Sequence, residues 1–323
     1  YFHAQGLLYC DMKPDNVMLS GDSLKIIDLG GVRHIDDEEA AIYGTIEYQA
    51  PEVAETGPTV ASDLYTVGRM LAVLLLASRG SQSTYSHRLP GPDEEPLFLQ
   101  HESLYRFLLK ATATDPIDRF DSADEMAEQL AGVLREEAAA RGEAKPAVST
   151  VFEPGGVVGS GAHDEVGPDW RLLPSPKFDV LDPGVGVLLG FADGEPAAVV
   201  ATLTSALVSG SVPATPETLL RLARAQLDAG KVEDAAASLD RLGDDRDWRL
   251  WWHRGLAALA RGGVAEAVDW LDAVYTELPG EVPAKLALAL AHEQAGDVAR
   301  SAGLYDRASR TDPSGRSTNP SST

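Results

Sequence analysis

Three segments in the last third of the chain share one pattern of glycine and small residues. They read "LDAGKVEDAAASL", "LARGGVAEAVDWL" and "HEQAGDVARSAGLY", and they align on Gly230, Gly262 and Gly296, which are 32 and 34 residues apart. A small residue follows five positions after each glycine: Ala235, Ala267 and Ser301. Glycine commonly ends a helix, and a small residue allows two helices to cross closely. The repeat therefore predicts stacked pairs of antiparallel helices.

The period is close to that of tetratricopeptide repeats, and we predict such repeats over residues 196–312. The last stretch, "DPSGRSTNPSST", is small and polar, so we expect residues 313–323 to be disordered. A stack of helix pairs has a concave groove, which favours protein docking or dimerisation. The alternative is that the tryptophans of this region only pack between helices: Trp248, Trp251, Trp252 and Trp270.

A second pattern lies close to the first residue. The stretch "LLYCDMKPDNVML", residues 7–19, sets Asp11, Lys13 and Asn16 between two apolar runs. This spacing matches the catalytic loop of protein kinases, in which an asparagine follows the aspartate by five residues. In that loop the carboxylate accepts the proton of the substrate hydroxyl, the ammonium lies beside the transferring phosphoryl group, and the amide binds magnesium. We therefore predict catalytic roles for Asp11 and Lys13 and a metal-binding role for Asn16.

Further kinase motifs follow in the expected order. "LKIIDLGG" places Asp28 after a β-type apolar run and before glycines, as in the magnesium-binding D-F-G motif, with Leu29 in place of the phenylalanine. "APE" follows at residues 50–52. By analogy with kinases, Asn16 and Asp28 would bind Mg²⁺ (or Mn²⁺), and Met18 and Ile27 would form the floor of the adenine pocket for ATP. Simple core packing is the alternative for both apolar residues.

Four other residues are expected to hold this site in place. Asp63 opens an apolar stretch, "ASDLYTVGRMLAVLLLA", which we predict to be a buried helix. In kinases an aspartate at this position accepts hydrogen bonds from the catalytic-loop backbone. Arg119 is the residue type that pairs with the A-P-E glutamate, here Glu52. Thr45 stands where a Ser/Thr kinase has the threonine that bridges the catalytic aspartate and lysine.

The amino-acid sequences of these segments resemble those of one protein family. "YCDMKPDNVMLSGDSLKIIDLGGV", "YGTIEYQAPEVAETGPTVASDLYTVGRML" and "DPIDRFDSADEMAEQLAGVLRE" are similar to the actinobacterial serine/threonine protein kinase G family. That family shares the D-L-G, the Q-A-P-E and repeats after the kinase domain. The resemblance implies a mainly α fold, with a kinase C-lobe and its small β-hairpins over residues 1–143. Residues 144–195 are rich in Pro and Gly, and we interpret them as an extended connector. It also implies ATP as cofactor and protein substrates, including small forkhead-associated regulators of metabolism.

One departure from common kinases concerns regulation. The usual H-R-D reads Tyr9, Cys10, Asp11, so the arginine that receives an activation-loop phosphate is missing. Between Asp28 and Gly44 there is no Ser or Thr, and the only hydroxyl is that of Tyr43. We therefore expect a kinase that is not switched on by phosphorylation of this loop. For the Cys10 thiol we favour a buried, inert state over a redox-active one.

Charge and cysteine content limit the partners. With 50 Asp and Glu against 27 Lys and Arg, the formal net charge is −23, which argues against nucleic acid or an anionic membrane as partner. The longest apolar run, "MLAVLLLA", is too short to span a bilayer. The single cysteine excludes an internal disulfide and favours a cytoplasmic protein.

A kinase also needs a Gly-rich flap, a strand lysine and a helix glutamate, and no segment here matches them. "GGVVGSG", residues 155–161, lies in the Pro-rich stretch and is expected to be linker. We therefore expect a kinase fragment without its N-lobe, inactive by itself. The alternative is a non-catalytic scaffold, or a pseudokinase-like interaction protein.

Overall fold

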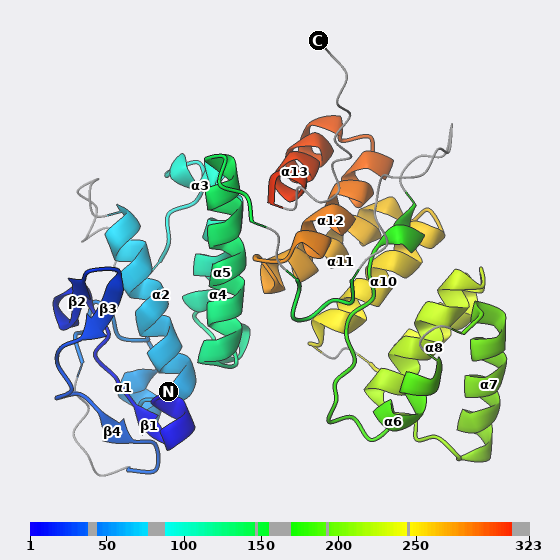
Figure 1. Ribbon diagram of the computed structural model, residues 1–323, viewed down its shortest axis with the longest axis horizontal. Helices are drawn as coiled ribbons and strands as arrows, with labels where there is room; N and C mark the ends of the chain where they lie inside the picture. The colour runs from blue at the N-terminus through cyan, green and yellow to red at the C-terminus, as the bar shows by residue number, and fades with distance from the viewer. Residues whose placement is uncertain are drawn as a thin grey trace. The chain divides into compact units, whose positions relative to one another are not determined.

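The computed structural model describes residues 1–37, 44–76, 88–145, 148–154, 169–191, 194–243 and 246–311. They form two compact units, Tyr1–Leu134 and Arg135–Thr323 (Figure 1). Both units are built mainly from helices, which confirms the predicted mainly α class. None of the helices in the described ranges combines the length and the apolar composition that crossing a membrane requires.

The first unit opens with short strands and turns. Its first elements are η1 (His3–Gln5), β1 (Leu7–Leu8), η2 (Pro14–Asn16), β2 (Val17–Ser20), β3 (Ser23–Ile26) and β4 (Arg33–His34). Strand β1 pairs with β4 in antiparallel register, Leu7 opposite His34. Strands β2 and β3 form a hairpin in which Ser20 lies opposite Ser23, and Gly21 in the turn has φ 62°. Glycine suits this tight turn because it adopts positive φ without steric strain.

Helices complete the first unit: α1 (Val53–Thr56), α2 (Val60–Leu76), α3 (Leu97–Gln100), α4 (Glu102–Ala111), η4 (Pro116–Asp118) and α5 (Ala123–Ala140), whose last turns belong to the second unit. Phe107 and Phe120 pack at the centre of the core, with their ring centroids 5.1 Å apart. A Cβ on Gly68 would lie 2.7 Å from the Cβ of Ala111, so the glycine allows α2 and α4 to approach closely.

Helix α2 differs in two ways from the buried helix expected from its sequence. It begins at Val60, so Asp63 lies within the first turn rather than at the start. Leu74 near its C-terminal end is 54% exposed. The helix buries only the side that packs on α4 and the neighbouring core. The prediction of a fully buried helix is therefore wrong, because apolar residues can also lie on an exposed face.

The second unit contains the predicted helix pairs. After η5 (Trp170–Leu172), α6 (Val185–Leu188) and η6 (Leu189–Phe191) come α7 (Pro196–Ser209), α8 (Pro216–Asp228), α9 (Val232–Asp240), α10 (Trp248–Ala260), α11 (Val264–Glu277), α12 (Val282–Gln294) and α13 (Val298–Thr311). The glycines of the sequence repeat, Gly230, Gly262 and Gly296, follow α8, α10 and α12 with φ between 73° and 77°. This left-handed backbone ends each helix, as the repeat predicted.

Small residues of the repeat lie at the helix crossings. Ala235, Ala267 and Ser301 are all buried. The tryptophans pack to different degrees: Trp252 is fully buried, whereas Trp270 is half-buried and lies under the guanidinium of Arg254. The expected disordered tail (residues 313–323) and the linker at residues 155–161 fall outside the described residues.

The described part of the connector packs against the repeats. Phe152 forms a β-bridge with Pro176, and its ring lies 4.8 Å from that of Trp252 and 5.1 Å from that of Trp248. Trp170 is buried in the same core. The connector therefore supplies core side chains to the second unit, rather than serving only as a spacer.

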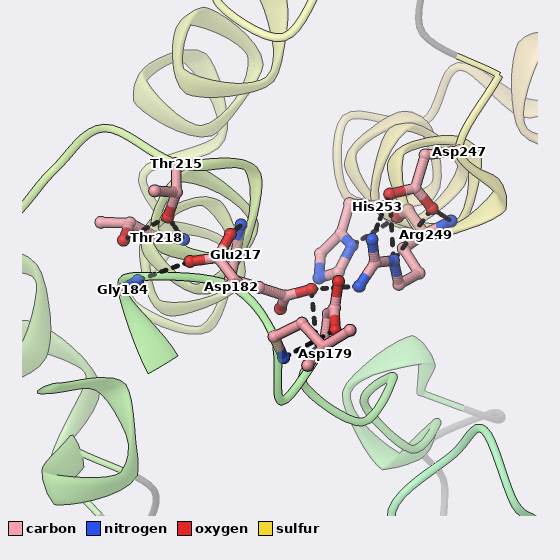
Figure 2. A network of polar contacts seen from close by, with 10 residues as sticks. Asp179, Asp182, Gly184, Thr215, Glu217, Thr218, Asp247, Arg249 and His253 are labelled. Carbon is pink, nitrogen blue, oxygen red and sulfur yellow. Dashed lines mark hydrogen bonds and ion pairs between the residues drawn. The ribbon is translucent and has the colours of Figure 1, made fainter. Parts of the chain in front are cut away.

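A polar network joins the connector to α8 and α10 (Figure 2). The carboxylate of Glu217 accepts a hydrogen bond from the amide of Asp179 at 3.1 Å and forms an ion pair with Arg249. Asp182 accepts a hydrogen bond from the amide of Glu217 at 3.3 Å. Arg249 also pairs with Asp247 at 2.6 Å. Backbone and side-chain groups thus tie the connector to the first turns of both helices.

Candidate functional site

The structure brings three of the sequence-predicted residues, Lys13, Asn16 and Thr45, together around the carboxylate of Asp11. Lys13 Nζ donates to Oδ2 of Asp11 at 2.8 Å and to Oγ1 of Thr45 at 2.8 Å. The hydroxyl of Thr45 donates to Oδ1 of Asp11 at 2.9 Å. The amide nitrogen of Asn16 donates to Oδ2 of Asp11 at 2.9 Å and to its main-chain carbonyl at 2.8 Å. Both carboxylate oxygens are therefore oriented by neighbours.

These contacts set the charge of the cluster. Burial raises the pKa of Asp11, but hydrogen bonds from Lys13, Thr45 and Asn16 outweigh it and hold that pKa below its usual value. The hydrogen bond to Asp11 raises the pKa of Lys13. At neutral pH the carboxylate and the ammonium are both ionised. Both side chains are about one-fifth exposed, so an incoming group can reach them.

The backbone before Asp11 is held by Asp63 of helix α2. Its carboxylate accepts hydrogen bonds from the amides of Tyr9 and Cys10, each at 2.7 Å. His3 Nε2 lies 3.0 Å from the same carboxylate, a partner that the sequence patterns did not identify. Cys10 has φ 66°, a strained conformation for a residue other than glycine. The paired hydrogen bonds to Asp63 stabilise this strained turn next to Asp11.

A second ion pair anchors the segment that carries Thr45. Arg119 donates to both carboxylate oxygens of Glu52, at 2.6 Å and 2.8 Å. Its guanidinium also lies 4.7 Å from the centroid of the Tyr65 ring. Because Arg119 is buried, its charge needs a partner, and the bidentate contact with Glu52 supplies that partner.

Tyr9 links the loop of Asp11 to the loop of Asp28. Its hydroxyl donates to the main-chain carbonyl of Asp28 at 2.6 Å. The carboxylate of Asp28 is exposed and accepts a hydrogen bond from the amide of Gly30 at 2.8 Å. The sequence marked Tyr9 as a departure from H-R-D, but the long-range partner of its hydroxyl was visible only in the structure.

The residues expected to bind a divalent metal ion have suitable donor chemistry. Asn16 offers an amide oxygen and Asp28 a carboxylate, and Mg²⁺ prefers such hard oxygen ligands. Within the described ranges there is no group of three His, Cys, Asp or Glu residues that could hold a metal alone. A Mg²⁺ ion bound with a nucleotide does not require one, because phosphates and water complete its coordination. The two residues therefore fit such an ion.

The residues expected at the adenine pocket lie on the β2–β3 hairpin and its continuation. Met18 is 48% exposed and Ile27 is 54% exposed. Other large apolar side chains of this region are also exposed: Leu19, Leu24, Ile26 and Leu29. Core packing within the first unit does not account for these side chains. They form an exposed apolar surface, which is unusual unless a ligand or another part of a protein covers it.

Cys10 has the properties of an inert thiol. It is buried, and burial and the charge of Asp63 raise its pKa to about 12. A thiol with this pKa is protonated at neutral pH and is a poor nucleophile. Tyr43, the only hydroxyl expected in the loop after Asp28, lies outside the described residues.

Comparisons with known proteins match both halves of the chain. Residues 1–145 match the family described as protein kinase domain, and residues 169–318 match protein kinase G tetratricopeptide repeat. The chain is 40% identical to serine/threonine-protein kinase PknG of Mycobacterium leprae and 38% identical to PknG of Mycolicibacterium smegmatis. Each of these alignments covers 92% of this chain. It is also 32% identical to serine/threonine-protein kinase PknB of Mycobacterium tuberculosis, over 56% of this chain and 31% of PknB.

The chain spans only 42% of the length of either PknG relative. Within that span, a kinase-domain match is followed by a match to the protein kinase G tetratricopeptide repeat, in the order that the sequence predicted. The chain therefore belongs to the protein kinase G family of serine/threonine protein kinases.

Proposed function

We propose that this chain carries the catalytic loop and the repeats of a protein kinase that transfers the γ-phosphoryl group of ATP to Ser or Thr hydroxyls of protein substrates. The observation that carries the proposal is the cluster in which Lys13, Asn16 and Thr45 all donate hydrogen bonds to Asp11. Docking by itself does not require such a cluster, so a scaffold without catalysis is not favoured.

In this proposal each residue of the cluster has a role. The ionised carboxylate of Asp11 orients the substrate hydroxyl and accepts its proton as the oxygen attacks. The ammonium of Lys13 stabilises negative charge on the transferring phosphoryl group. Thr45 holds both side chains in register through its hydroxyl. Asn16 and Asp28 would hold Mg²⁺ or Mn²⁺, which neutralises charge on the ATP phosphates when bound.

The remaining predicted residues would support this chemistry. Met18 and Ile27 would contact the adenine ring, since exposed apolar side chains suit a flat aromatic ligand. We propose that residues 1–143 correspond to a kinase C-lobe. The proposed activity is that of the whole protein, because no segment of this chain matches a Gly-rich flap or strand lysine. We expect the chain alone to be inactive.

We further propose that the repeats bind protein substrates or a second copy of the protein. Among substrates, the family resemblance favours small forkhead-associated regulators. The use of ATP and the single cysteine favour a cytoplasmic location.

The proposal is tested by phosphoryl transfer with the full-length protein that contains this chain. We expect transfer of radiolabel from [γ-³²P]ATP to Ser or Thr of a protein substrate, dependent on Mg²⁺. Lys13→Met should abolish most of this transfer, while Lys25→Met on the exposed β3 strand should not. Absence of any label transfer by the wild-type protein, with metal and ATP present, would contradict the proposed activity.

A further inference from the structure

A buried guanidinium lies in the first unit outside the cluster around Asp11. Arg69 of helix α2 is only 4% exposed, and its Nε has no hydrogen-bond partner among the described residues. Buried charges in proteins are normally paired, because an uncompensated charge is poorly solvated in the interior. The other arginines of comparable burial follow this rule: Arg119 pairs with Glu52 and Arg224 pairs with Asp228. Arg69 forms no ion pair within the part of the chain that the structure describes.

The position of Arg69 points to the segment that follows Thr45. Tyr65 precedes Arg69 by one helical turn, so the two side chains leave the same face of α2. Tyr65 is buried together with Ala50 and Val53, which come just after Thr45 in the chain. The guanidinium of Arg69 also lies close enough to the phenol of Tyr48 for each group to influence the pKa of the other. Arg69 therefore lies beneath the segment 46–50.

This segment adjoins the proposed site of phosphoryl transfer. Thr45 contacts both Asp11 and Lys13, and the amide of Tyr48 donates to the carbonyl of Thr45 at 2.9 Å. When the Ser or Thr hydroxyl of a protein substrate reaches Asp11, the substrate residues next to that Ser or Thr therefore lie close to segment 46–50 and to Arg69. Because the whole chain carries a net charge of −23, an acidic substrate would be repelled except where a local cation receives it.

We propose that Arg69 is a specificity-determining residue that binds an acidic side chain of the protein substrate, located within a few residues of the accepting Ser or Thr. The substrate carboxylate supplies the counter-charge that Arg69 lacks in the described structure, on the side of Arg69 that lies near Tyr48. The preferred substrates are then Ser/Thr segments with a nearby Asp or Glu. This inference rests on the proposed kinase function and names the substrate class of the same site.

The test uses the full-length protein and an array of peptides. Each peptide has one Thr among neutral residues and carries either Glu or Gln at one flanking position, so every Glu peptide has an uncharged twin. We expect kcat/KM for at least one Glu peptide to exceed that of its twin by about tenfold or more, as for a charge-assisted hydrogen bond. Arg69→Gln should reduce this ratio to about one, and Arg69→Lys should retain part of it.

Arg88→Gln is the matched control, because Arg88 lies in the same unit but is exposed and paired with Glu94. It should leave the Glu/Gln ratio unchanged. Arg69→Met provides a check on folding: because the guanidinium has no partner in the described structure, its loss should not lower the melting temperature. A drop of several degrees, as expected for loss of a buried pair, would overturn the premise.

The possible failures are distinct. If the wild-type protein phosphorylates Glu and Gln peptides equally, or if Arg69→Gln keeps the preference, the inference is wrong while the kinase function stands. If the wild-type protein transfers phosphate to no peptide and no protein, the proposed function fails and this inference fails with it.

Discussion

Each of the two units contains a carboxylate beside a cation, but the pKa values of the two carboxylates shift in opposite directions. In the first unit, hydrogen bonds from Lys13 and its neighbours hold the pKa of Asp11 below its usual value despite burial. In the second unit, burial raises the pKa of Glu217, and the charge of Arg249 only partly offsets it. Glu217 is 3% exposed, whereas Asp11 is about one-fifth exposed.

The difference separates two uses of an ion pair. A carboxylate that is to accept a proton from a bound hydroxyl must be ionised and within reach of that hydroxyl. A carboxylate that ties a connector to two helices can be sealed from water, provided that its partner stays in place. The surroundings of Asp11 favour chemistry, and those of Glu217 favour a fixed structure.

The largest expected effect is on the accessible carboxylate. Asp11→Asn removes the proton acceptor while keeping the size of the side chain. We expect kcat for protein phosphorylation by the full-length protein to fall by about 10²–10⁴-fold. Radiolabel transfer from ATP measures this fall. Asp15→Asn, at an exposed acid of the same loop, should change kcat little. Nearly full activity in Asp11→Asn would exclude the proposed role of this residue.

The buried pair of Glu217 and Arg249, here called the sealed pair, should instead contribute to the stability of the second unit. Glu217→Gln weakens the contact between α8 and Arg249, which keeps Asp247 as its partner, and we expect a loss of about 1.5–3 kcal/mol in the free energy of unfolding of the second unit. Tryptophan fluorescence during urea denaturation reports this unit selectively, because all five tryptophans lie in it: Trp170, Trp248, Trp251, Trp252 and Trp270.

The matched control for the sealed pair is Glu266→Gln. Glu266 pairs with Arg261 at the surface, so its loss should lower stability by less than about 1 kcal/mol. Equal effects of the two substitutions would show that burial does not distinguish the pairs.

A histidine beside the sealed network predicts how stability depends on pH. Nδ1 of His253 donates a hydrogen bond to the main-chain carbonyl of Arg249 at 2.7 Å, and burial lowers the pKa of His253 to about 4 (Figure 2). In the unfolded chain a histidine has a pKa of about 6.5. The unfolded state therefore binds the proton first as the pH falls, and stability is lost between about pH 6.5 and about pH 4.

From pH 7 to pH 5 we expect the second unit to lose about 2 kcal/mol in the free energy of unfolding through His253. Tryptophan fluorescence at both pH values measures the loss. His253→Gln should flatten this dependence, while His292→Gln, on the partly exposed side of α12, should keep it. A wild-type stability that does not change over this range would contradict the assigned burial of His253.

The smallest effect concerns the orientation of Asp11. Thr45→Ala removes the hydroxyl that contacts both Asp11 and Lys13 but leaves the carboxylate itself. We expect kcat/KM to fall by about fivefold to thirtyfold, the equivalent of one or two hydrogen bonds. Thr45→Ser, which keeps the hydroxyl, should restore most of the activity. If the serine variant is as impaired as the alanine variant, the hydroxyl is not what orients the site.

Local sequence was sufficient for the parts of the site whose residues are neighbours in the chain. Asp11, Lys13 and Asn16 lie in one turn, and their spacing alone placed them in one motif. Thr45 and Asp63 are far from that turn in sequence, so their assignment depended on analogy with the motifs of protein kinases. The contacts of His3 with Asp63 and of Tyr9 with Asp28 were not predicted, because nothing local in the sequence identifies a partner many residues away.

The sequence by itself determined the helix pairs of the second unit. It also determined which polar residues stand in the loop of Asp11, Lys13 and Asn16. Gly230, Gly262 and Gly296 end helices because only glycine adopts positive φ without strain, and this property is local. Only the tertiary structure decided that the connector inserts Phe152 into the repeats and that Arg69 is buried without a carboxylate in the described structure. Burial and pairing arise from contacts between distant segments, and these contacts decide which charges are sealed and which remain within reach of a substrate.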